Sequence, residues 1–229
     1  MRGRSSYSLA GTASVLAGLS FVVVIITLFL NPAESLRDPA EYWAFLANDP
    51  NAVLLQVIES WALGLGSLLA IAVVLVLLDH LRSQSETWIR WTSILALVGF
   101  AVFAINSFTS IAADPARAAA YATGGAAVRA AIEVTPLVVV DQQGWVAAGT
   151  VGLWLLTVSL VGLRSKEFSW GLHVVGILSA AAYWILIALL TLNPELIGSP
   201  ASSLFFLVPL WYLWMGVTLL RLGPIPAEP

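Results

Sequence analysis

The sequence has no cysteine, and only 10% of its 229 residues are charged. The lack of cysteine excludes disulfides, thiolate-bound metals, iron–sulfur clusters and thiol nucleophiles. A soluble domain carries about 25% charged residues, so this chain has too few to cover a surface that faces water. Its net charge of −3 is small, and the charges are spread along the chain. We therefore expect no nucleic acid among its partners.

Signatures of catalysis are missing as well. The chain contains no G-x-S-x-G, H-E-x-x-H or G-x-x-x-x-G-K-[ST] pattern. Asp79 precedes His80, but no further histidine or carboxylate follows at the spacing of a metal site. The sequence thus favours a protein without catalytic residues, metal or cofactor, although it does not decide whether the protein is an enzyme.

Long hydrophobic runs dominate what is present. Hydrophobic residues make up 59% of the chain, and the mean hydropathy is +0.91. The run from Val53 to Leu78 has Glu59 as its one ionisable residue, and it is long enough to cross a hydrocarbon layer of about 30 Å. We predict an all-α membrane protein, a single integral domain over residues 1–229 with six transmembrane helices, at about 8–30, 53–78, 88–111, 144–163, 170–192 and 203–222.

Residues 112–143 do not fit this pattern. They are rich in alanine and include Gly124, Gly125 and Pro136. The segment is too long for a tight turn and too charged for another crossing. We predict an irregular, partly helical segment between the third and fourth spans, on the outer side of the membrane.

The basic residues predict the orientation. With both termini inside, the inner segments carry most of the arginines and lysines, and the outer segments carry Arg37, Arg117 and Arg129. Loops rich in basic residues stay in the cytoplasm. We expect a multi-pass protein of the plasma (inner) membrane of a prokaryote, with a cytoplasmic N-terminus and C-terminus.

Small residues recur every four positions in several spans, as in Ala10, Ser14 and Gly18, or in Ala62 and Gly66. This spacing places them on one helix face, where backbones approach closely. The first interpretation is a compact bundle whose only certain partner is the lipid bilayer. The second is that one such stripe joins the chain into a homo-oligomer or a larger membrane complex.

Glu59 is the first candidate for a functional residue. It lies about two turns inside the second span, where an ionisable side chain is costly unless it is paired, hydrated or protonated. Arg117 and Arg129 are candidate partners on the same side, and Asn106 lies near the outer end of the third span.

Arg129 and Glu133 are four residues apart, so they are also placed to pair with each other on one helix face. We predict a ligand or ion-pair site at Glu59, Asn106, Arg129 and Glu133, between the second and third spans and the 112–143 segment. The alternative is that Glu59 clamps that segment to the bundle or lies at the level of the headgroups.

The two histidines, His80 and His173, both fall at the inner boundary. Two histidines on different helices are weak candidates for haem ligands. The simpler interpretation is a pair of solvated interfacial side chains.

Several motifs resemble a family of six-helix bacterial membrane proteins that is known only as a domain of unknown function. The second span runs from LLQVIES to DHLRS, and the fourth is GTVGLWLLTVSLVGLRS. The last span contains VPLWYLW, in which the proline stands two residues before Trp211 and Tyr212 replaces the expected acidic residue. The resemblance implies a six-helix fold and no catalytic residues, and the departure at Tyr212 puts a shared acidic site in doubt.

Two functions follow as hypotheses. The first is a non-catalytic membrane protein, either an accessory subunit or a binder of lipid or small apolar ligands. The second is a small secondary carrier in which Glu59 couples transport to protons.

Overall fold

The computed structural model describes residues 2–31, 38–136, 140–141, 144–165, 168–192 and 205–222. Within these ranges the regular structure is helical. The helices are α1 (Arg2–Leu30), α2 (Pro39–Asn48), α3 (Pro50–Leu81), α4 (Glu86–Thr123), α5 (Ala126–Glu133), α6 (Ala147–Ser165), α7 (Trp170–Leu192) and α8 (Leu207–Arg221).

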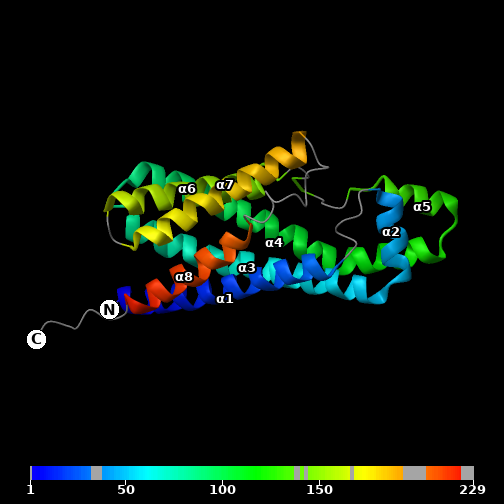
Figure 1. Cartoon of the computed structure of the whole chain (residues 1–229), viewed down its shortest axis with the longest axis horizontal. Helices are drawn as coiled ribbons and strands as arrows, with labels where there is room; N and C mark the ends of the chain where they lie inside the picture. Colours follow the sequence, from blue (N-terminus) through cyan, green and yellow to red (C-terminus); the bar gives the residue numbers. More distant parts are fainter. Residues whose placement is uncertain are drawn as a thin grey trace, which may run out of the picture.

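Six of these helices form an elongated bundle. In Figure 1 they run along the long axis of the molecule, whereas α2 lies across one end, close to α5. Helices α1, α3, α4, α6 and α7 are long and apolar enough to cross a membrane, and α8 is a shorter apolar helix. The predicted all-helical membrane fold is thereby confirmed. The fifth predicted span coincides with α7; residues 203–204 of the sixth lie outside the described part of the chain.

Helices α1 and α3 pack antiparallel in one register along their whole length. At one end, the Tyr7 hydroxyl lies 2.7 Å from Nδ1 of His80. In the middle, the ring of Phe21 lies against Gly66. At the other end, the Asn31 side chain donates to Oε1 of Gln56 at 3.3 Å. Polar contacts therefore fix both ends of the pair, and close packing at a glycine fixes its centre.

Helices α6 and α7 are also closely packed, at two glycines of α6. Gly152 of α6 faces Tyr183 of α7, and Gly162 faces His173. A side chain at Gly162 would collide with the histidine ring. Small residues let the helices approach closely, as expected where lipid provides little hydrophobic drive for association.

The stripe of small residues on α1 packs against α8 of the same chain. Gly11 and Gly18 of α1 lie against Leu220 and Leu213 of α8, and the Ser14 hydroxyl donates to the carbonyl of Tyr212 at 2.6 Å. A homo-oligomer would therefore have to use another surface than the stripe of α1.

Helix α4 continues past residue 111, where the third span was predicted to end. It passes through Pro115 and stops at Thr123, before Gly124 and Gly125. Proline removes one backbone hydrogen bond but does not end this helix. With 38 residues α4 is about 57 Å long, much longer than the hydrocarbon layer of about 30 Å. Its length thus exceeds the thickness of that layer by roughly 27 Å.

The end of α4 belongs to a small unit that we call the cap: α2, α5, the first turns of α3 and the last turns of α4. The cap has a hydrophobic cluster of its own, separate from that of the bundle. Its buried members come from α2, α3 and α4; they are Tyr42, Trp43, Leu46, Ala52, Ala118 and Tyr121. Burial of Ala118 and Tyr121 explains why α4 stays helical after Pro115.

Asp-Pro steps begin α2 and α3, two of the helices that contribute to the cap. The Asp38 carboxylate accepts a hydrogen bond from the backbone N–H of Ala40 at 2.8 Å, and that of Asp49 from Asn51 at 2.9 Å. An aspartate at the N-cap followed by proline is a strong helix start. The sequence signal was present in both places, and it explains why α3 begins at Pro50 rather than at Val53.

Candidate functional site

Tyr121 is the hub of the cap. Its hydroxyl donates to Oε1 of Glu133 at 2.7 Å, and the Arg129 guanidinium lies 5.5 Å from the centre of its ring. Nε of Arg129 also donates to the backbone carbonyl of Tyr121 at 3.0 Å. Two predicted site residues, Arg129 and Glu133, are thus brought together by a tyrosine of α4. They contact this tyrosine from α5, a helix with no buried residue of its own.

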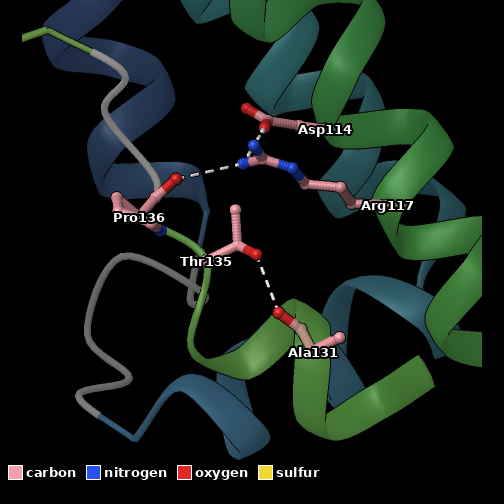
Figure 2. Close-up of polar contacts among 5 residues, drawn as sticks. All are labelled: Asp114, Arg117, Ala131, Thr135 and Pro136. Carbon is pink, nitrogen blue, oxygen red and sulfur yellow. Dashed lines mark hydrogen bonds and ion pairs between the residues drawn. The ribbon is translucent and has the colours of Figure 1, made fainter. Parts of the chain in front are cut away.

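An ion pair near the end of α4 contacts the chain that follows α5. Arg117 Nη1 lies 3.8 Å from Oδ1 of Asp114 and donates to the carbonyl of Pro136 at 3.3 Å. Figure 2 shows the guanidinium between these two groups, and shows Thr135 bonded to the carbonyl of Ala131. Both charged side chains are largely buried, at 21% exposed for Arg117 and 7% for Asp114. A partly buried pair of this kind is costly to break, because either partner alone leaves an unmatched charge.

Asn106 of α4 binds the backbone of the chain between α5 and α6, at Val140. Its Nδ2 donates to the Val140 carbonyl at 2.8 Å, and its Oδ1 accepts from the Val140 N–H at 3.2 Å. The next residue, Asp141, has a positive φ of 61° and accepts from the N–H of Ala147 at 2.6 Å, at the start of α6. Asn106 therefore positions the turn that leads into α6, at a distance along α4 from the Tyr121 hub.

Glu59 lies on another face of the bundle. It is half-buried in α3, seven residues before Gly66 and three after Gln56, both of which contact α1. Helical spacing places Glu59 on that same face, towards α1. Arg117 and Arg129, considered as its partners, have Asp114 and Tyr121 beside them instead. The candidate residues thus form three separate arrangements.

A groove opens between α4 and α5. It has a volume of about 510 Å³ and is lined by small and apolar side chains with one arginine: Ala116, Arg117, Ala120, Ala127, Val128, Ala131 and Ile132. A second groove of about 490 Å³ lies farther along α4, against α3, between Leu68 and Phe108. Both are open depressions of the surface and not enclosed cavities.

The two histidines meet around one phenylalanine at the end of the bundle opposite the cap. The centre of the Phe168 ring lies 5.3 Å from that of His80 and 5.9 Å from that of His173. His80 is also bound to Tyr7. The Phe168 ring thus lies beside both imidazoles, and haem ligation by the two histidines stays a prediction.

No group of three metal-binding side chains is found among the described residues. The cap nevertheless contains two functional candidates that sequence reasoning missed, Asp114 and Tyr121. A signal was available for Asp114, because Asp-Pro-x-Arg places its carboxylate one turn before Arg117. Tyr121 carried no such signal, since its role depends on where α5 folds back.

The helical bundle and its apolar surface define a multi-pass membrane protein. The chain belongs to a family described as a domain of unknown function, DUF4386, which matches residues 16–223. This confirms the predicted resemblance. No curated protein and no solved structure matches the chain.

Proposed function

We propose that the protein is a non-catalytic membrane protein that binds a lipid or another small apolar ligand in the groove between α4 and α5. The groove is the observation that carries this proposal. It belongs to the cap, where α4 has already run farther than a bilayer is thick. Apolar surface in such a place is exposed to water unless something covers it.

The charges of the groove favour an uncharged or zwitterionic occupant. Arg117 is its one ionisable lining residue, and the neighbouring Asp114 balances that charge. An anionic ligand would gain little from a guanidinium that is already paired. Binding would therefore come mainly from burial of apolar surface, at about 25 cal/mol per Å².

The test uses a monoacylglycerol with a diazirine on its acyl chain, added to the protein in nanodiscs. After photolysis, mass spectrometry should find adducts on the walls of the groove. Ala131→Phe fills the groove from an exposed position on α5 and should lower this labelling several-fold. Leu19→Phe, on the exposed face of α1, is the matched control. Equal labelling in both variants would reject the proposal.

A small secondary carrier with Glu59 as its proton-coupling residue is the second candidate. Its support is a half-buried carboxylate on the α3 face that meets α1, since ionisable groups at membrane depth often belong to ion pathways. Glu59→Gln should abolish proton-linked uptake by proteoliposomes if this candidate holds. Uptake that does not change would reject it.

We further propose that both termini face the cytoplasm of a prokaryotic cell. Arg82, Arg164 and Arg221 follow or end α3, α6 and α8 on the side of the bundle away from the cap, which agrees with the positive-inside rule. Reporter fusions after Arg82 and Arg164 should report the cytoplasm. A periplasmic signal from either would reject this orientation. Whether the chain also assembles with copies of itself or with other subunits stays a prediction.

A further inference from the structure

The groove between α4 and α5 has two chemically different ends. The two helices are joined at Gly124 and Gly125, and near this turn the groove is lined by alanine and valine side chains. Arg117 also lines the groove, but it stands about 10 Å farther back along α4. There it meets the chain that leaves α5, at the carbonyl of Pro136. The groove therefore runs from an apolar end to an end that carries a guanidinium.

The guanidinium of Arg117 engages its neighbours through one of its nitrogens. Nη1 lies 3.8 Å from Oδ1 of Asp114 and donates to the Pro136 carbonyl at 3.3 Å (Figure 2). Among the described residues, these are the partners that the guanidinium has. The side chain is 21% exposed, so the N–H groups of Nε and Nη2 are left to donate to water or to an occupant of the groove.

The lining of the groove restricts the polar group that such an occupant can carry. A guanidinium only donates, so its partner must accept. Apart from Arg117, the lining side chains are those of alanine, valine and isoleucine, and they provide no acceptor for a hydroxyl proton. A carbonyl oxygen accepts and brings no proton of its own. A carbonyl therefore suits this site better than a hydroxyl does.

The Asp114 carboxylate restricts the charge of the occupant. It is buried beside the same guanidinium, and a second carboxylate or a phosphate at Nε or Nη2 would be repelled by it at short range. A neutral carbonyl meets no such repulsion. It still gains a hydrogen bond from a charged donor, which is stronger than one between neutral groups.

We infer that the groove selects a neutral acyl ester such as a monoacylglycerol. The ester carbonyl accepts from Nε or Nη2 of Arg117, and the acyl chain lies along Ala116 and Ala120 towards Gly124. This inference rests on the function proposed above, and it adds the class of the ligand and the residue that anchors its headgroup.

The test compares competitors in the photolabelling assay. The protein is placed in nanodiscs of a diether phosphatidylcholine, so that the bilayer lipid contains no acyl carbonyl. Unlabelled monoacylglycerol, its 1-O-alkyl ether analogue and the free fatty acid, all with the same chain, compete with the diazirine-bearing monoacylglycerol. The ester should halve the labelling at a concentration about ten-fold lower than the ether or the fatty acid, as expected for one hydrogen bond from a charged donor.

The outcomes separate this inference from the function on which it rests. If the groove is labelled but the ester competes no better than the ether or the fatty acid, the inference is overturned and the groove remains a ligand site. If the walls of the groove are not labelled at all, both are overturned.

Two matched double variants test Arg117 itself. Asp114→Asn with Arg117→Met removes the donors and the buried charge together, and the preference for the ester over the ether should disappear. Asp79→Asn with Arg82→Met makes the same changes in the exposed pair at the end of α3, and the preference should persist. Because the readout is a ratio of two competitors, a general loss of stability does not alter it. A preference that survives in the Asp114–Arg117 variant would overturn the assignment to Arg117.

Discussion

Gly162 of α6 and His173 of α7 lie so close that the imidazole ring occupies the space a methyl group at Gly162 would need. A Cβ there would also lie 2.8 Å from each ring nitrogen. The histidine is buried, so the ring cannot swing into solvent. This contact fixes both the distance between the two helices and the position of the His173 ring.

Gly162→Ala should therefore destabilise the bundle. Overpacking of a close contact typically costs about 1–3 kcal/mol, and it should appear as a lower melting temperature in detergent. Gly125→Ala is the matched control, since a Cβ at Gly125 meets nothing within 4 Å. Equal melting temperatures for the two variants would show that α6 and α7 do not approach as closely as described.

Two Asp-x-x-Arg pairs on α3 and α4 provide a matched comparison for the cap. Asp114–Arg117 is largely buried, whereas Asp79–Arg82 has the same spacing and side chains that are 80% and 66% exposed. Arg117→Ala should cost about 1–3 kcal/mol, because it leaves the buried Asp114 carboxylate without its cation and with the Ser110 side chain as a remaining hydrogen-bond partner. Arg82→Ala should cost less than about 1 kcal/mol.

Chemical denaturation would measure both changes. If Arg117→Ala proves as mild as Arg82→Ala, the Asp114–Arg117 pair does not hold the cap. The double variant Asp114→Asn with Arg117→Ala should recover part of the loss, since the unpaired charge is gone.

Tyr121→Phe should loosen α5. This helix buries no residue, and the Tyr121 hydroxyl is one of its few ties to α4 through Glu133. Segments with few buried contacts open locally at low cost. Hydrogen–deuterium exchange should become faster over residues 126–133 and stay unchanged in α6. Thr123→Val is the control, because the Thr123 hydroxyl bonds within its own helix, to the carbonyl of Ala119. Faster exchange in both variants would reject the specific role of Tyr121.

Tyr7→Phe tests the register of α1 on α3. It removes the hydroxyl that lies 2.7 Å from Nδ1 of His80 but keeps the ring, which packs edge-on against the imidazole. A hydrogen bond of this kind contributes about 0.5–1.5 kcal/mol. A double-mutant cycle with His80→Ala should give a coupling energy of that size. A coupling near zero would mean that the two side chains act independently.

Sequence reasoning could locate the long helices because the apolar run of each is a local signal of hydropathy. It placed α7 at 170–192, which the structure reproduces. It ended the third span at 111 because Asp114, Pro115 and Arg117 disrupt the apolar run. The helix continues there because Ala118 and Tyr121 pack against α2, a tertiary contact that hydropathy does not encode.

The candidate site was predictable only in part. Arg129 and Glu133 do lie together, yet they meet through Tyr121, because α5 folds back after Gly124 and Gly125 towards α4. Asn106 binds the backbone of Val140, a partner that depends on the path of the chain between α5 and α6. Contacts of this kind follow from chain reversal, for which spacing along one helix gives no signal.

The central claim is that α4 leaves the bilayer before it reaches the groove, so that the cap is surrounded by water. The absence of native cysteine allows single-cysteine variants with spin labels along the exposed face of this helix. In nanodiscs, labels at Val98 and Ile105 should collide mainly with oxygen, which dissolves in lipid, and labels at Ala119 and Thr123 mainly with a water-soluble nickel chelate. Oxygen-dominated collisions at all four positions would place the cap within the membrane and contradict the account.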